Sequence, residues 1–182
     1  SEVWGSKVLG GRWHRTLRGE DVLEPPGRRQ TVSHSHVLPP DLRTDAGAYG
    51  ILVRLTHKAA ARMRKIDYWA GAVSVGLSFI DEPAAGGGWG RGGWAVGCRL
   101  QHCQDTLTIL RAVARLWDAR PRGRVPFKVG MVLSELRPAR SSTPSLFEAD
   151  RRAAEASKAM DAVNAEFGAS VIHLGAMTGY ET

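Results

Sequence analysis

YWAGAVSVGLSFI, residues 68–80, decides the fold, because large and small side chains alternate along it. A period of two predicts a β-strand with one buried and one open face. After a glycine-rich turn at residues 85–93, residues 94–101 repeat the alternation. Two neighbouring strands therefore share a bulky face and a small one. The bulky set is Val73, Val75, Leu77, Phe79, Trp94, Val96, Cys98 and Leu100.

The segments on either side extend this pair into a larger sheet. Residues 31–38 are predicted to form a strand that Pro39 ends, and residues 127–134 alternate as a fourth strand. Apolar periodicity predicts one helix from Thr44 or Asp45 to about residue 66 and a second after the capping residue Asp105. The order β-α-β-β-α-β indicates an α+β fold, a four-stranded sheet with two helices on one face.

Each predicted helix has an apolar side that we expect to pack on the sheet. The first helix places Ala48, Leu52, Leu55, Ala59 and Met63 on that side and Arg54, Lys58, Arg62 and Lys65 on the other. The second places Leu107, Leu110, Val113, Leu116 and Trp117 on its apolar side.

The face of the sheet away from the helices is predicted to be open and small. Such a face lets backbone amides approach a partner, and its few cations can contact phosphates, as a nucleic-acid groove requires. A half-exposed sheet that merely avoids apolar patches has the same composition. The expected members are Ala72, Ser74, Gly76, Ala95, Gly97, Arg99, Gln101, Lys128 and Gly130.

Charge is distributed unevenly along the chain. The net charge is +7 and the pI is about 10.0. Residues 31–140 contain 16 Lys or Arg and 8 Asp or Glu, whereas residues 141–182 contain 3 and 6. The basic middle favours an acidic partner, although a solvated basic surface is the alternative. No segment approaches the roughly 18 apolar residues of a membrane span, so we expect a soluble, cytoplasmic protein without a membrane partner.

The two cysteines, Cys98 and Cys103, offer little for a metal. A structural zinc site takes about four ligands, and His102 beside Cys103 has no second ligand pair elsewhere in the sequence. His34 and His36 likewise have no evident third ligand. We therefore expect no metal site, a buried strand cysteine and reduced thiols.

The tail is predicted to hold one more helix and a strand. Ser145 and Glu148 have capping-box spacing before a helix whose apolar side carries Ala149, Ala153, Ala156, Met160 and Val163. Gly168 is expected to stop this helix, and residues 170–174 to form a last short strand.

In order and spacing these segments resemble the C-terminal part of bacterial Y-family, DinB- or UmuC-like, translesion DNA polymerases. VLGGRWHRTLRGED (residues 8–21) is similar to the closing helix of the thumb, and RRQTVSHSH (28–36) to the tether and first strand of the little finger. Residues 105–117 and 128–136 resemble that domain's second helix and last strand, and residues 159–168 the segment after it. The resemblance implies a thumb end at 1–27, a little finger at 28–140 and a C-terminal extension at 141–182.

The resemblance further implies binding of double-stranded primer-template DNA through its phosphates, in DNA repair and the SOS response. Phosphate contacts give position without sequence preference, which suits a polymerase that copies damaged templates. Gln30 replaces the lysine usual in the tether. The DNA-contacting residues carried over by position are Arg28, Arg29, Thr31, Ser33, His34, His36, Arg99 and Lys128.

Catalysis is not expected in this chain. Asp81 and Glu82 imitate part of the palm's carboxylate motif, but they follow a little-finger strand and precede Pro83, which is typical of a turn. We expect no catalytic residues and no cofactor here, whereas the parent polymerase would use Mg²⁺ on a palm domain. An independent enzyme using this pair is the weaker alternative.

A second partner is suggested by TPSLF, residues 143–147. It resembles the short peptide with which bacterial polymerases dock on the sliding clamp, with Leu146 and Phe147 as apolar anchors, although Thr143 replaces the leading glutamine. The alternative is that the two anchors cover the domain's own core. The competing function is accordingly a palm-less adaptor that recruits the clamp or other repair proteins through the acidic tail.

Overall fold

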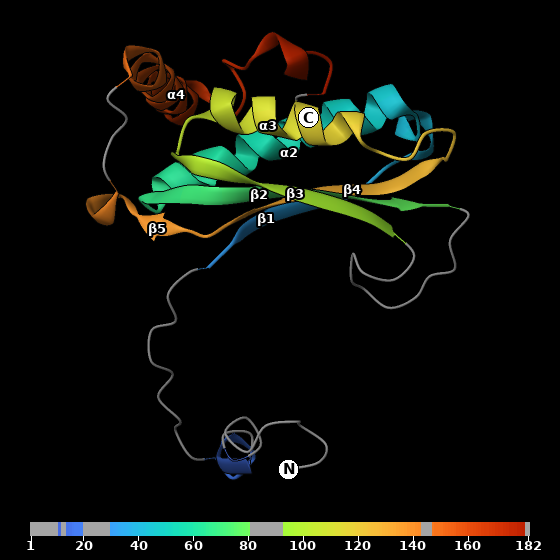
Figure 1. The fold of residues 1–182 in the computed structure, drawn as a ribbon, viewed down its shortest axis with the longest axis horizontal. Helices are drawn as coiled ribbons and strands as arrows, with labels where there is room; N and C mark the ends of the chain where they lie inside the picture. Colours follow the sequence, from blue (N-terminus) through green and yellow to red (C-terminus); the bar gives the residue numbers. More distant parts are fainter. Residues whose placement is uncertain (1–10, 12–13, 20–29, 81–92, 143–146, 181–182) are drawn as a thin grey trace.

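The computed structural model describes residues 11, 14–19, 30–80, 93–142 and 147–180. Four strands form the main sheet: β1 (Val32–Val37), β2 (Tyr68–Phe79), β3 (Gly93–Cys103) and β4 (Pro126–Ser134). All neighbours are antiparallel, in the order β1-β4-β2-β3. The helices α2 (Asp45–Lys65) and α3 (Thr106–Asp118) lie together on one face of this sheet (Figure 1). The predicted β-α-β-β-α-β order is confirmed.

Both helices begin where the sequence predicts. The Thr44 hydroxyl accepts a hydrogen bond from the Gly47 amide at 3.0 Å, and an Asp105 carboxylate oxygen accepts one from the Thr108 amide at 2.7 Å. These N-caps satisfy amides that have no partner within the helix, which fixes the first turn of each.

The hydrophobic core lies between the two helices and the bulky face of the sheet. The predicted strand residues Val73, Val75, Leu77 and Phe79 are buried, as is the predicted apolar side of α2. On α3 the prediction is partly wrong, because Ile109 and Ala112 are fully buried whereas Leu107 and Leu110 are only half-buried. Relative to the expected stripe, the buried stripe is therefore rotated about the axis of α3 by roughly half the angle between successive residues.

Arg54 also departs from expectation. The sequence assigns it to the solvent side of α2, yet it is only 6% exposed. Its neighbours on the same stripe, Lys58 and Arg62, are exposed as predicted.

A short strand, β5 (Arg137–Pro138), extends the sheet at the start of β2. It pairs with Tyr68 and Trp69 after Glu135, which has a left-handed backbone with φ of 52°. Asp67, with φ of 59°, makes the corresponding turn between α2 and β2. Left-handed backbone is uncommon for residues other than glycine, and here it accompanies the two tight turns that bring β5 onto β2.

The C-terminal segment begins with α4 (Glu148–Phe167), and Gly168 ends that helix as predicted. Two expectations are wrong. The N-cap is Phe147, without a side-chain cap, and not Ser145, which lies outside the described residues. Residues 170–174 form turns and bends, not a strand, and lead into the 3-10 helix Gly175–Met177, where Met177 is buried. An apolar run alone does not make a strand, because a strand also needs a neighbouring strand with which to pair.

The segment likened to a thumb helix, residues 8–21, lies mostly outside the described residues. Within it, residues 14–17 are helical, and the Arg18 amide donates to the His14 carbonyl at 3.3 Å.

Candidate nucleic-acid interface

One face of the main sheet is left open by α2, α3 and α4 (Figure 1). The strand alternation sends every second side chain to this face, and most of these side chains are small or carry hydroxyls. The members that the sequence predicted are confirmed on it. The complete set on the four strands is Ser33, Ser35, Val37, Ala72, Ser74, Gly76, Ser78, Gly93, Ala95, Gly97, Arg99, Gln101, Lys128, Gly130, Val132 and Ser134.

Strand pairing arranges this open face in rows that cross the sheet. One row joins Ser35, Gly130, Gly76 and Ala95, so that side chains larger than methyl appear only at its β1 end. Adjacent strands lie about 4.8 Å apart, so a row spans about 14 Å. A partner can approach the backbone closely across the middle of the sheet.

The next row shows why a glycine is required on β3. It joins Ser33, Val132, Ser74 and Gly97. A Cβ at Gly97 would lie 2.5 Å from the Ser74 hydroxyl oxygen and 3.1 Å from the Val73 carbonyl oxygen. Real side-chain carbons essentially never approach as closely as the first of these distances, and the second is already a tight contact. Gly97 therefore leaves room for the Ser74 hydroxyl.

Two of the predicted cations lie on the open face. Lys128 is on β4, paired with Ser78 of β2 and Val37 of β1. Arg99 is on β3, with a side chain 87% exposed, 3.7 Å from a Glu135 carboxylate oxygen. An ion pair this exposed contributes little to stability, which leaves Arg99 available to an anionic partner.

The residues predicted on β1 divide between the two faces of the sheet. Ser33 is exposed on the open face, and Thr31 is exposed just before the strand. His34 and His36 are half-buried and lie on the helix side. Burial lowers the pKa of both imidazoles, and the nearby charges of Arg62 and Lys58 for His34, and of Arg54 and Lys58 for His36, lower it further. The two histidines therefore do not share a face with Ser33.

The sequence reasoning did not single out Ser35, Ser78 and Ser134. They share the open face with Ser33 and Ser74, giving it five serine hydroxyls. Hydroxyls are frequent donors to phosphate oxygens. The alternation carries this signal for Ser78 and Ser134, which have the same parity along their strands as Ser74 and Gly130. It does not carry it for Ser35, because the sequence prediction places no residue of the first strand on the open face.

Several predicted residues lie outside the described residues. These are Arg28, Arg29, Leu146, Asp81 and Glu82. Of the clamp-like motif only Phe147 is described, and its side chain is 68% exposed. Phe147 therefore does not pack into the core of this domain.

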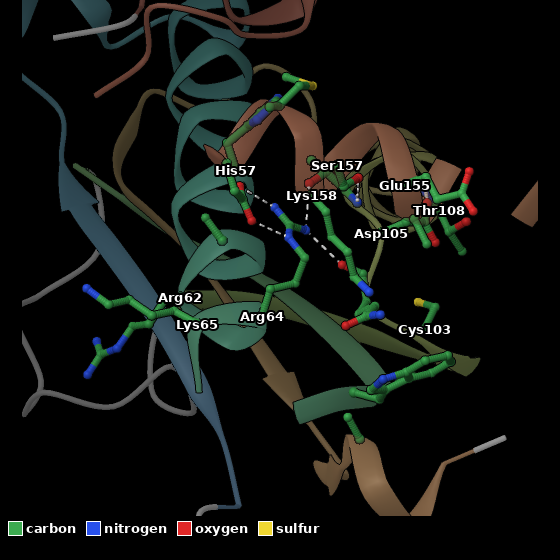
Figure 2. Close-up of a pocket in the computed structure, with 18 of the residues that line it drawn as sticks. His57, Arg62, Arg64, Lys65, Cys103, Asp105, Thr108, Glu155, Ser157 and Lys158 are labelled. Atoms are coloured by element: carbon green, nitrogen blue, oxygen red, sulfur yellow. Dashed lines mark hydrogen bonds and ion pairs between the residues drawn. The ribbon is translucent and has the colours of Figure 1, made fainter. Parts of the chain in front are cut away.

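A separate hollow of about 1460 Å³ lies on the helix side, between the end of α2, the start of α3 and α4. Arg64 reaches from α2 across it to α4 (Figure 2). Its guanidinium donates to both carboxylate oxygens of Asp161, at 2.6 and 2.8 Å, and to the Gln104 carbonyl at 2.7 Å. The Thr106 amide donates to the Ser157 hydroxyl at 3.1 Å. Polar contacts thus hold α4 against the helix layer.

The cysteine thiols show no sign of reactivity. Cys103 is 9% exposed, and burial, followed by the charges of Asp105 and Asp150, raises its pKa to about 12. Cys98 is half-buried on the helix side of β3, and both cysteines are free thiols. In the part of the chain that the structure describes, no three acidic, histidine or cysteine side chains cluster as metal ligands. Nor is any described helix both long and apolar enough to cross a bilayer.

Comparison with protein families gives one informative match. A model described as the impB/mucB/samB family C-terminal domain matches residues 29–146, well over half of the 182 residues. The matched range contains all of β1 to β5, α2 and α3 and stops just before α4. No curated protein matches the sequence.

Two solved structures are similar at low identity. A little finger domain of PolIV, solved in complex with a beta-clamp processivity factor, is 19% identical with a TM-score of 0.45; the match covers 64% of this chain and 97% of that one. A Dbh-Dpo4 chimera of a Y-family DNA polymerase is 14% identical with a TM-score of 0.49, covering 73% of this chain and 36% of that one. At these identities no residue role transfers from either structure.

Proposed function

Because the chain belongs to the impB/mucB/samB family and carries its C-terminal domain, the little finger of a Y-family DNA polymerase, we propose that it binds primer-template DNA without sequence preference. The observation that carries the proposal is the open face, where hydroxyls and glycines surround Arg99 and Lys128. Such groups contact phosphates and sugars, which are the same at every base pair. A role in translesion synthesis during DNA repair and the SOS response follows from the family.

In this proposal residues 28–140 are the DNA-binding domain, 1–27 the end of a thumb and 141–182 a C-terminal extension. Arg28, Arg29, Thr31 and Ser33 contact the DNA backbone at the β1 edge, and Arg99 and Lys128 contact it across the sheet. The chain contributes binding, and the Mg²⁺-dependent chemistry belongs to a palm domain of the parent polymerase.

Fluorescence anisotropy with a labelled primer-template duplex tests DNA binding. The affinity is expected to fall steeply with salt and to change little with sequence. Lys128→Glu should weaken binding and reduce the salt slope by about one or more, as for a lost phosphate contact. The matched control is Lys158→Glu, an exposed lysine on α4, far from the open face. Salt-insensitive binding, or equal effects of the two substitutions, contradicts the proposal.

A second function, docking on the sliding clamp, is favoured by the exposure of Phe147. We propose that Leu146 and Phe147 are its two anchors, because an exposed apolar side chain such as that of Phe147 can enter a hydrophobic pocket on a partner and Leu146 precedes it in the sequence. Replacing both by Ala should abolish binding to immobilised clamp in surface plasmon resonance. Phe167→Ala, at the other end of α4 and 65% exposed, is the control. If the double variant Arg28→Ala, Arg29→Ala loses DNA binding but still binds the clamp, the competing function of a palm-less adaptor is favoured.

A further inference from the structure

Three cations form a stripe along one side of α2. Arg54, Lys58 and Arg62 follow one another at intervals of four residues. Four residues of α-helix advance about 6 Å, so the stripe is about 12 Å long. Figure 2 shows Arg62 and Lys65 leaving α2 on the opposite side from Arg64.

The helix side of β1 lies along this stripe. His36 is in the electrostatic reach of Arg54 and Lys58, and His34 in that of Lys58 and Arg62. Alternate residues of a strand lie about 6.8 Å apart, close to the helical interval of the cations. The two histidines and three cations therefore lie side by side at the edge of the sheet, on a surface between β1 and α2 that we call the β1–α2 groove.

No acidic side chain neutralises the β1–α2 groove within the described residues. The charges that act on His34 and His36 are all positive. Other arginines of the helix layer are paired: Arg64 with Asp161, and Arg120 with Asp45. Arg54, Lys58 and Arg62 have no ion pair with any residue that the structure describes.

Arg54 makes the β1–α2 groove more than a basic surface. It is 6% exposed, and its Nε is buried without a hydrogen-bond partner among the described residues. An arginine cannot lose its charge, so a side chain that is almost wholly buried and whose Nε lacks a partner favours an anion that can accept from it. Lys58, four residues further along the helix, adds a second positive charge to the same side of α2.

We propose that the β1–α2 groove binds the phosphates of a nucleic-acid strand that continues from the open face around the edge of β1. This inference rests on the proposed function and adds a second contact surface to it. A DNA strand carries one charge per about 3.4 Å of helix axis, so the stripe faces three or four phosphates. β1 links the two surfaces, because Ser33 and Ser35 lie on its other side.

The composition of the β1–α2 groove favours nucleic acid over an acidic peptide. Peptide recognition relies on apolar anchors that enter pockets. None of the large, exposed apolar side chains of the described residues lies on the Arg54–Lys58–Arg62 side of α2 or on the helix side of β1. The charged fork of Arg54 is, in contrast, a typical phosphate ligand.

The test compares Lys58→Gln with Arg62→Gln in one variant against Arg111→Gln with Arg115→Gln in another. The control pair is exposed on α3 with the same four-residue spacing. With the full chain and a labelled primer-template duplex, the β1–α2 pair should weaken binding about 10-fold or more and lower the salt slope by about two. The control pair should change affinity less than about two-fold, as expected for charges outside the contact surface.

Arg54→Met provides a second measurement. Removing an unpaired buried charge should raise the melting temperature while it weakens DNA binding, a combination that misfolding cannot produce. If the wild type binds DNA and the two double variants bind it with equal affinity, the inference is overturned and the proposed function stands. Absence of DNA binding by the wild type refutes both. The inference is also overturned if the wild type binds a labelled poly-glutamate peptide, the β1–α2 double variant alone loses that binding, and DNA binding is unchanged. That outcome assigns the groove to a protein.

Discussion

Asp161→Asn should release α4 without unfolding the sheet. Asp161 is the only carboxylate that contacts the Arg64 guanidinium in the described part of the chain, and the Arg64 side chain is 7% exposed. On α4 only Ser157 is buried, so little apolar area holds this helix in place. The ion pair is therefore a large share of what docks α4.

The magnitude follows from the bonds that change. Asn keeps one neutral acceptor and loses the charge of a bidentate pair, while Arg64 retains its bonds to the Gln104 carbonyl and the Thr106 hydroxyl. Hydrogen bonds to charged groups contribute about 1.5–3 kcal/mol each, so a net loss of about 2 kcal/mol is expected. That corresponds to a roughly 30-fold increase in the population of undocked α4.

Native-state hydrogen exchange measures this population directly. Protection of the α4 amides should fall about 30-fold, while the amides of β2 and β4 should keep their protection, because local opening does not pass through global unfolding. Glu166→Gln removes a charge from the same helix at an exposed position and should leave both sets unchanged. An equal loss of protection in α4 and the sheet, or no loss in α4, refutes the reasoning.

Three further predictions concern packing and pH. Gly97→Val should lower the free energy of unfolding by about 1–3 kcal/mol in urea unfolding, because a Cβ at this position meets the Ser74 hydroxyl, and it should also weaken DNA binding. Ala95→Val, on the same face, is the control, and equal losses for the two variants would contradict the argument. Gly50→Ala should displace the Tyr180 ring from α2, seen as lost near-UV circular dichroism of the tyrosine and faster proteolysis of the C-terminus. Burial, followed by the charges of Arg64 and His173, lowers the His57 pKa from 6.5 to about 4, so the unfolded chain binds the proton more readily. Stability should therefore fall as pH drops through 6.5 towards 4, and His57→Gln should flatten that slope in thermal melts; an unchanged slope refutes it.

The sheet and its helices were predictable because local signals agreed with tertiary structure. Alternation along residues 72–79 and the caps at Thr44 and Asp105 identify elements whose bounds the structure matches closely. The tail was less predictable. Val171 and Ile172 are apolar and β-branched, yet a strand also requires a partner edge, and the sequence does not show whether this segment reaches one.

Two properties of the candidate site were not predicted from the sequence, for different reasons. The burial of Arg54 depends on how β1 and α2 pack, which a helical periodicity does not report. The separation of His34 and His36 from Ser33 follows from strand parity, but the motif resemblance groups them as consecutive residues. Residues that a motif places next to one another therefore belong to one contact surface only if they point to the same face of the strand.

The alternation along β1 also makes its pairing with β4 critical. Val32 lies opposite Leu133, and each later residue of β1 follows in the same register. A slip of one residue would turn the serines towards α2 and the imidazoles towards the open face. Insertion or deletion of a single residue within this strand should therefore exchange the chemistry of two surfaces at once, while leaving the composition of the strand almost unchanged.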